Sequence, residues 1–397
     1  MNVMIHLSEQ GIPSPTAPEG NDHPSARVGR RDFLRVAGWV SLAPIAIALA
    51  ACGATGAPVP AGSASPKPSS APSSGGQPAV AAASAAGSPS AKAAEKVKVS
   101  FAAKAAVYAP HFIAIEKGYY AQEGIELEIQ NAGGGVATPA LLSGSLPYST
   151  SSDSALSAII KGAPLRVIYT NADASTQQLW VTTDVKAVAD LRGKIVGLAT
   201  RGDSNEVSTR LFLQAHGLDP NSVAYTALGF GNAPMAALKG GSVPAAVISP
   251  SNGLQLKQAG FTGHMLGDYS DVKVLYTGLA TSAKQLEQQR DLTKRLLRAT
   301  ARGREYYKAF KEQTLAILGK YDGLPRAANE LDYEGTLKTM TPEGWAPVEE
   351  QQSDAVVRAQ LLKVPKDNIP SPDKMYDYGI MKEVYQELKS SGWKPQR

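Results

Sequence analysis

Apolar and polar residues alternate in two short stretches near position 100 of this chain. The first runs from Val97 to Phe101 and the second from Ile125 to Ile129, with apolar side chains at every other position, a period typical of β-strands. Between them, Pro110 suits a first helical turn and Gly118 suits the left-handed residue that ends a helix. The pattern predicts strand, loop, helix, strand. The loop Ala102 to Ala109 then lies at the carboxyl end of a strand, where open α/β sheets bind ligands.

Similar alternation continues to about residue 280 and then gives way to helical spacing. Strands are predicted at 165–169, 179–182, 194–199, 223–227, 246–248 and 272–276, and helices at 136–143, 151–161 and 207–216. From Leu292 to Phe310 apolar side chains recur with the helical period. The predicted fold class is therefore α/β, with a helical C-terminal region.

One segment of the chain is repeated about a hundred residues later. Ala140 to Tyr148 reads ALLSGSLPY, and Ala237 to Ala245 reads ALKGGSVPA. Two similar helix-to-strand corners at this distance suggest two lobes built on one plan. The predicted strands 179–182 and 272–276 would cross between the lobes. We therefore expect residues 95–182 plus 272–397 to form the first lobe and residues 183–271 to form the second.

Two motifs resemble a known family, the periplasmic solute-binding proteins of the nitrate/sulfonate/taurine and thiamine-precursor class. The first motif comprises Pro110, Ala114, Gly118, Tyr119, Tyr120, Glu123, Gly124, Ile125 and Glu126. The second is the segment Asp190 to Leu198, DLRGKIVGL. The resemblance implies a type II periplasmic binding protein, a two-lobed Venus flytrap with a helix-flanked sheet in each lobe. Pro147 and Pro244 depart from it, since both stand where the family has Asp.

The composition and the absence of several known motifs argue against other functions. The net charge is only +5 and no basic cluster is present, so nucleic-acid binding has little support. A single cysteine, Cys52, excludes intramolecular disulfides and cysteine-based metal sites. The chain has no nucleophile elbow, no metal-binding His pair and no dinucleotide fingerprint. We expect no enzyme activity, no cofactor and no metal.

The N-terminal region has the pattern of an exported lipoprotein. Arg30 and Arg31, followed by Phe33 and Leu34, resemble a twin-arginine motif, and an apolar run follows that is too short for a comfortable membrane span. The run ends in LAACG, which resembles a lipobox with Cys52 as the acylated residue; an uncleaved anchor helix is the alternative. We expect residues 1–51 to be an export signal with a disordered leader, used by the twin-arginine or the general secretory route.

The next segment, residues 52–94, consists almost wholly of Ala, Ser, Pro and Gly. Such a composition cannot bury enough apolar area to offset the entropy of ordering, so we expect a flexible tether. A random chain of this length reaches on the order of 35 Å. The protein would then lie in the periplasm or on the exterior of the cell envelope, anchored to a membrane by the lipid on Cys52.

Candidate ligand contacts lie where strands and glycine-bearing loops run into helix N-termini, which are sites for anions or carbonyl oxygens. They are Tyr108, His111, Ser151, Ser152, Asp153, Thr200, Gly202, Ser204, Asn205, Ser249 and Asn252. For Ser151 to Asp153, simple helix capping is the alternative. The resemblance matches Tyr108 to an aromatic ligand contact of the thiamine-precursor binders. An aromatic ring beside hydroxyls suits a small organic solute, and we expect an anionic one ahead of a neutral heteroaromatic one.

These features together predict a lipid-anchored, monomeric solute-binding component of an ABC importer. It would capture a small organic or anionic solute by hinge closure and then dock on a membrane permease. Two alternatives stay open: an enzyme on the same fold, such as one acting on a menaquinone precursor, and a ligand sensor for a membrane kinase.

Overall fold

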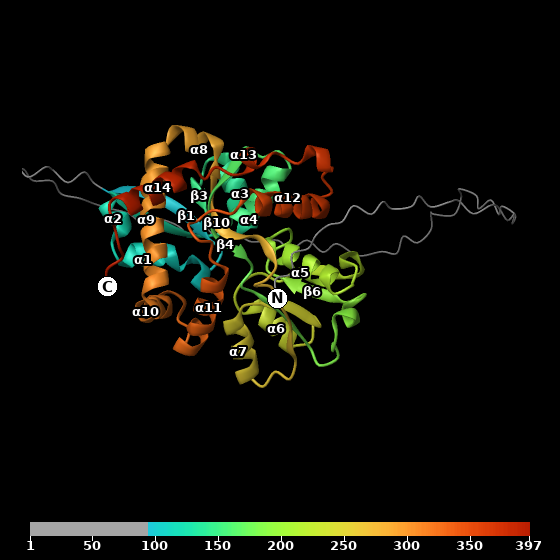
Figure 1. Ribbon diagram of the computed structural model, residues 1–397. Helices are drawn as coiled ribbons and strands as arrows, with labels where there is room; N and C mark the ends of the chain where they lie inside the picture. The colour runs from blue at the N-terminus through green and yellow to red at the C-terminus, as the bar shows by residue number, and fades with distance from the viewer. Residues whose placement is uncertain (1–93) are drawn as a thin grey trace, which may run out of the picture. The chain divides into compact units, whose positions relative to one another are not determined.

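The computed structural model describes residues 94–397, and these form one compact unit with two sheets (Figure 1). Arg30, Arg31, Cys52 and the predicted tether up to residue 93 lie outside the described residues. We call the part around the first sheet lobe I and the part around the second sheet lobe II. Within the described part of the chain, no helix is long and apolar enough to cross a membrane.

Lobe I contains a five-stranded sheet in the order β2-β1-β3-β10-β4. β1 pairs in parallel with β2 and β3, whereas β10 runs antiparallel to β3 and β4. The elements are β1 (Glu95–Phe101), α1 (Ala109–Glu116), α2 (Tyr119–Gln122), β2 (Ile125–Asn131), α3 (Gly134–Ser143), β3 (Tyr148–Ser149), α4 (Ser152–Ile160), β4 (Leu165–Ala174) and β10 (Lys273–Ser282). The predicted opening unit is confirmed: Pro110 lies in the first turn of α1, and Gly118, two residues beyond the end of α1, has a φ of 69°, which favours glycine.

Lobe II repeats this plan with the strand order β7-β6-β8-β5-β9. Its central strands β6, β7 and β8 are parallel, and β5 runs antiparallel to β8 and β9. The elements are β5 (Gln178–Val181), β6 (Ile195–Leu198), α5 (Ser204–Ala215), β7 (Ala224–Ala227), α6 (Ala233–Lys239), β8 (Ala245–Ile248), α7 (Pro250–Gln258) and β9 (His264–Asp268). Each five-stranded sheet thus contains one antiparallel strand, β10 or β5, among four parallel ones.

The repeated corner has the same hydrogen bonds in both lobes. The hydroxyl of Ser145 donates to the carbonyl of Ala140 at 3.3 Å, and that of Ser242 donates to the carbonyl of Ala237 at 3.1 Å. The carbonyl of Pro147 accepts a hydrogen bond from the hydroxyl of Thr281, and the carbonyl of Pro244 accepts one from that of Thr182. The prolines that replace the family's Asp therefore join each corner, through the backbone, to an antiparallel strand.

The boundary between the lobes differs from the prediction. β5 pairs with β8 and β9 in the second sheet, so the chain crosses between Ala174 and Gln178, upstream of the boundary expected after residue 182. This was not predictable from the sequence, because Leu179, Trp180 and Val181 are buried on both faces of their strand and would suit either sheet. The return crossing lies where it was predicted, at the start of β10.

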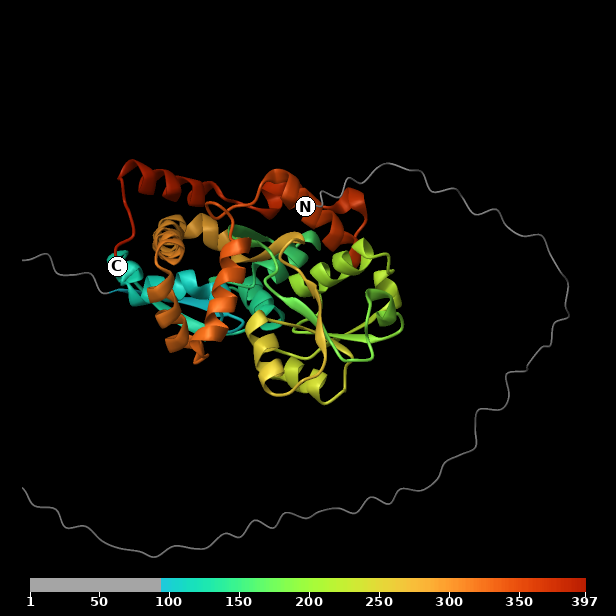
Figure 2. The same cartoon turned by 60° about the horizontal axis from the view of Figure 1, so that its bottom comes forward.

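The remaining chain is helical and packs mainly on lobe I (Figure 2). It contains α8 (Ala283–Gln288), α9 (Arg290–Ala309), α10 (Lys311–Asp322), α11 (Arg326–Thr339), α12 (Val348–Leu362), α13 (Pro372–Met375) and α14 (Gly379–Ser390). α9 approaches α1 closely because of Gly303, where a Cβ would lie 2.0 Å from the carbonyl oxygen of Pro110. α11 and α12 also reach lobe II, through α7 and α5 respectively.

Candidate functional site

Tyr108 and the N-terminus of α4 form the lobe I side of the candidate site. Tyr108 ends a short 3-10 helix before α1, is 9% exposed, and its hydroxyl lies near Thr150. Ser151 is the N-cap of α4, but its side chain makes no capping hydrogen bond. The hydroxyl of Ser152 is buried and has no hydrogen-bond partner within the described residues. Neither hydroxyl therefore caps α4 in this structure.

The N-terminus of α5 forms the facing side in lobe II. α5 begins at Ser204, earlier than the predicted start at residue 207, because the carboxylate of Asp203 accepts the backbone N–H of Glu206 and caps the helix. Ser204 and Asn205 thus belong to the first helical turn. Asn205 accepts a hydrogen bond from the hydroxyl of Ser175, in the segment between β4 and β5.

A carboxylate of lobe I occupies this helix N-terminus. Oδ2 of Asp153, in the first turn of α4, accepts the backbone N–H of Ser204 at 2.9 Å and its hydroxyl at 3.0 Å. The same two helices meet again where the hydroxyl of Ser157 donates to the carbonyl of Gly202 at 3.0 Å. The predicted residues of α4 and α5 are therefore brought together, and the partial positive charge of α5 is balanced by the protein itself.

A second contact between the lobes has the same form. The carboxylate of Asp332, on α11, accepts the backbone N–H of Ser251 at 3.0 Å, at the N-terminus of α7. Ser249 caps this helix by accepting the N–H of Asn252, and its hydroxyl bonds that of Ser251. Ser249 and Asn252 therefore lie at an interlobe contact, as cap residues of α7. In both contacts a carboxylate of lobe I holds a helix N-terminus of lobe II.

Acidic groups with raised pKa values lie at both contacts between the lobes, and a tyrosine lies near the first contact. Burial, and next the charge of Asp153, raises the pKa of Asp203 to about 7. Burial raises the pKa of Asp332 to about 6. Tyr276 lies near the start of β10. Burial raises the pKa of its phenol, and the nearby charges of Asp153 and Asp203 raise this pKa further. Gln177 donates to the Tyr276 hydroxyl at 2.9 Å.

Two of the predicted residues have other roles. His111 lies in the core of lobe I, where Nδ1 is hydrogen-bonded to the Tyr120 hydroxyl at 2.7 Å and burial lowers the pKa of its ring to about 3. Its prediction as a cleft residue is wrong, because the ring is neutral and committed to a core partner. Thr200 lies near Asp203, and its backbone favours the charged form of that carboxylate.

Sequence reasoning missed the residue that ties these parts together, Arg358 on α12. Its guanidinium is fully buried, pairs with Asp354 at 2.8 Å, and donates to the Ser204 hydroxyl at 3.1 Å and to the carbonyl of Leu275 at 2.8 Å. The i, i+4 spacing of Asp354 and Arg358 was visible in the sequence, but this spacing is more typical of a solvated helix face. Asp203 and Tyr276 could have been found, since Asp203 lies in a loop predicted to form the site and Tyr276 in a strand predicted to cross between the lobes.

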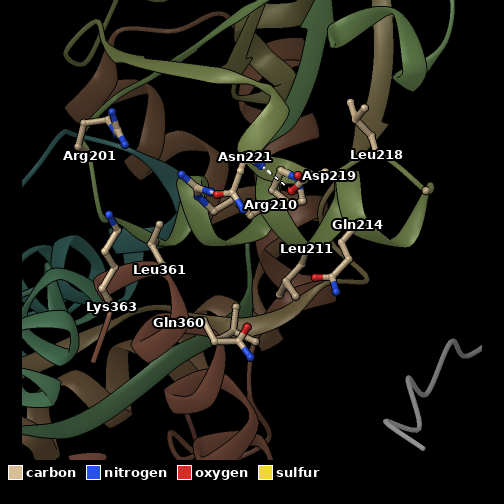
Figure 3. A pocket seen from close by; sticks show the side chains of 13 residues that line it. Arg201, Arg210, Leu211, Gln214, Leu218, Asp219, Asn221, Gln360, Leu361 and Lys363 are labelled. Atoms are coloured by element: carbon tan, nitrogen blue, oxygen red, sulfur yellow. Dashed lines mark hydrogen bonds between the residues drawn. The ribbon is translucent and has the colours of Figure 1, made fainter. Parts of the chain in front are cut away.

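A separate pocket of about 620 Å³ lies between α5 and the end of α12 (Figure 3). Its basic side chains are Arg201, Arg210 and Lys363. Both arginines already pair with Glu206. Arg201 also donates to the Tyr225 carbonyl, and Arg210 donates to the side-chain oxygen of Asn221. The pocket therefore offers few free donors to an anion, and it contains none of the predicted ligand contacts.

Two lobes joined by crossing strands, with polar helix N-termini facing one another, define the fold of the extracytoplasmic solute-binding proteins. Residues 105–313 match the family model described as NMT1/THI5 like, and the chain belongs to this family. The riboflavin-binding protein RibY of Chloroflexus aurantiacus is 28% identical over 203 residues, which are 49% of this chain and 57% of that protein. The match spans a little over half of that relative's length.

Solved structures share the fold at low sequence identity. The alkanesulfonate-binding protein SsuA from Xanthomonas axonopodis pv. citri, bound to MOPS, has a TM-score of 0.61 and 17% identity, covering 71% of this chain and 98% of that one. The periplasmic nitrate-binding protein NrtA from Synechocystis PCC 6803 has a TM-score of 0.62 and 17% identity, covering 75% and 89%. The desulfurization enzyme DSZB has a TM-score of 0.52 and 13% identity, covering 74% and 99%. The fold thus serves binding proteins and an enzyme.

The described residues contain no metal-binding cluster, since nowhere in 94–397 do three or more His, Cys, Asp and Glu side chains gather around one point.

Proposed function

We propose that this chain is the solute-binding component of an ABC importer, held at the cell envelope by acylated Cys52 and working as a monomer. It captures a small organic solute between its lobes by hinge closure and presents it to a membrane permease. The family membership and the binding-protein fold support this proposal. The Cys52 anchor rests on the sequence pattern alone.

The solute we propose is uncharged and rich in N–H or O–H donors, in contrast to the anion expected from the sequence. The observation that carries this choice is that carboxylates of lobe I occupy two helix N-termini of lobe II, Asp153 that of α5 and Asp332 that of α7. An anion entering here would meet carboxylates instead of free N–H groups, and would lose the helix-terminus stabilisation that such sites normally supply. A donor group, in contrast, has carboxylate and phenol oxygens to bond, and Tyr108 and Tyr276 supply ring faces.

A thermal-shift comparison on the full-length chain tests both parts of the proposal. Riboflavin, chosen because one relative is named a riboflavin-binding protein, represents uncharged ring solutes; an alkanesulfonate and nitrate represent anions. A ligand at a hundred times its dissociation constant adds about 2.7 kcal/mol to the free energy of unfolding.

We expect riboflavin or another uncharged heteroaromatic compound to raise the unfolding temperature, and the anions to leave it unchanged. A shift with the sulfonate or nitrate alone would show that the solute class is wrong while binding is right. Turnover of the bound compound, followed by chromatography of the mixture, would instead support an enzyme on this fold. No shift with any compound would contradict a role in solute capture.

A further inference from the structure

The loop after β7 exposes a large apolar side chain. Phe230 is 43% exposed and stands between Gly229 and Gly231, whose φ angles are 84° and 74°. Residues with a side chain rarely adopt such angles, so the loop needs both glycines to keep its shape. An exposed phenylalanine fixed by two such residues calls for a partner.

The partner is a glycine of the other lobe. A Cβ built on Gly133, just before α3, would lie 2.8 Å from Cε2 of Phe230, closer than side chains approach one another. The φ of Gly133 is −78°, which any residue can adopt. Gly133 is therefore required here for space and not for backbone conformation, and the space is taken by the ring of Phe230.

This contact lies at the edge of the candidate site in both lobes. In lobe I the neighbouring Gly134 rests on α4, since its Cβ would lie 2.0 Å from Oγ of Ser154 and 3.6 Å from Cβ of Ser151. In lobe II the N–H of Gly229 donates to the carbonyl of Ala199, where the loop leading to α5 begins. Phe230 thus connects the segment before α3 in lobe I with the loop that leads to α5 in lobe II.

We propose that Phe230 is the gate of the solute cleft, and that its ring seats on Gly133 when the lobes close. Hinge opening separates the two residues, because they belong to different lobes, and leaves the ring exposed beside the entrance. With the ring seated on Gly133, as in this structure, 43% of Phe230 is still exposed, so closure covers part of the ring, narrows this edge of the cleft and slows the escape of the solute. The inference rests on the proposed solute-binding function, but the closing contact can be measured without any solute.

The test measures the distance between the lobes by pulsed electron paramagnetic resonance. The full-length chain carries Cys52→Ala, and spin labels are attached to cysteines placed at Lys161 of lobe I and Ala236 of lobe II, both exposed positions. We compare this background with Phe230→Ala, with Gly133→Ala and with the double variant. Met265→Ala, which truncates a similarly exposed side chain of lobe II (44%), serves as the control.

We expect each of the two single variants to reduce the closed population at least threefold, Phe230→Ala by losing the contact and Gly133→Ala by pushing a methyl group into the ring. The double variant should match Phe230→Ala alone, because without the ring the added methyl meets nothing. The control should match the background. Identical distances in all chains, or effects that simply add in the double variant, would overturn the gate.

A second measurement separates the gate from the solute proposal. If riboflavin binds, its dissociation rate should rise about tenfold or more in Phe230→Ala and stay unchanged in Met265→Ala; an unchanged rate in Phe230→Ala would overturn the gate. If no solute binds, the proposed function fails, and the distance measurement alone decides on the gate.

Discussion

At the scale of single residues, the carboxyl groups of Asp153 and Asp203 are buried close to one another. Ionising both of them there costs free energy. Asp203 carries the consequence: its pKa rises from 3.8 to about 7, first through burial and then through the charge of Asp153. In the unfolded chain Asp203 loses its proton near pH 4. Between about pH 4 and pH 7 the folded protein therefore holds a proton that the unfolded chain has released, and stability falls as the pH rises through this window.

Asp203→Asn removes this titration and keeps a good helix cap, because Asn is as effective as Asp at an N-cap. We expect the variant to gain stability relative to the native chain as the pH rises from 5 to 8, by on the order of 1 kcal/mol or more. Urea unfolding at the two pH values measures the difference.

Asp219→Asn is the matched control, since Asp219 is exposed and also caps a helical turn, through the N–H of Asn221. Its effect should be the same at both pH values. A gain for Asp203→Asn that is equal at pH 5 and pH 8 would contradict a raised pKa.

Tyr108 offers a residue-scale prediction about binding. Tyr108→Ala removes a nearly buried ring from the wall of the site and should weaken solute binding by about 1 to 3 kcal/mol. Tyr108→Phe keeps the ring and loses only the hydroxyl, so it should weaken binding less. Isothermal titration with the solute from the thermal-shift comparison measures both; equal affinity in all three chains would remove Tyr108 from the site.

Single residues were predictable where a local pattern marked them. The residues before α4 and around the start of α5 follow strands and begin helices, which is visible in the sequence. The roles of Asp332 and Arg358 were not predictable, because their partners Ser251 and Ser204 are 81 and 154 positions away. His111 was misplaced for a similar reason: its core partner network, Tyr120 and then Thr300, is completed by a helix far along the chain.

At the scale of elements, α12 joins the two lobes through one side chain. Arg358 reaches α5 and β10 from α12, and its only carboxylate partner within hydrogen-bond distance in the described structure is Asp354. Truncating one member of a buried ion pair leaves the other charge unpaired, which typically costs about 3 to 5 kcal/mol.

Arg358→Met should therefore lower the free energy of unfolding by about that amount. The double variant Arg358→Met with Asp354→Asn should be less destabilised than Arg358→Met alone, because no unpaired charge remains. Denaturant unfolding of four chains, namely the native chain, Arg358→Met, Asp354→Asn and the double variant, measures the coupling. A double variant that loses the sum of the two single effects would contradict the ion-pair account.

Element types were predicted better than element boundaries. The sequence patterns identified the strands of both sheets except β3 and β9, and glycines marked most helix ends. The start of α5 was missed because Asp203, Ser204 and Asn205 are all acceptable N-caps, and only the hydrogen bond from Glu206 shows which one acts. β5 was assigned to the wrong lobe because a strand buried on both faces carries no mark of the sheet to which it belongs.

At the scale of the whole molecule, the predicted lipid anchor gives a direct test. Cys52→Ala should release the protein from membranes into the soluble fraction, because no other acylation site is available to a chain with one cysteine. Fractionation followed by an alkaline wash measures this. The charge-neutral control Ser63→Ala, in the same segment, should stay with the membrane; membrane association of Cys52→Ala after the wash would contradict the lipobox.

The two-lobed plan was predictable because the chain repeats a short sequence at both helix-to-strand corners. The same strand order in both sheets confirms it. What the repeat could not predict is how the lobes touch, since the carboxylates Asp153 and Asp332 have no equivalents in the repeated segment. The contacts between the two lobes come from the parts of the sequence in which the lobes differ.

The insertion of lobe II between β4 and β10 also fixes an order of assembly during synthesis. All strands of lobe II lie within residues 178–268, so this lobe can pair its sheet soon after it leaves the ribosome. The sheet of lobe I begins at Glu95 but needs β10 between β3 and β4, and β10 ends only at Ser282. Until then β3 and β4 have open edges that can pair wrongly. The lobe whose synthesis starts first is thus the last to be completed, and it is the one most in need of protection on a nascent chain.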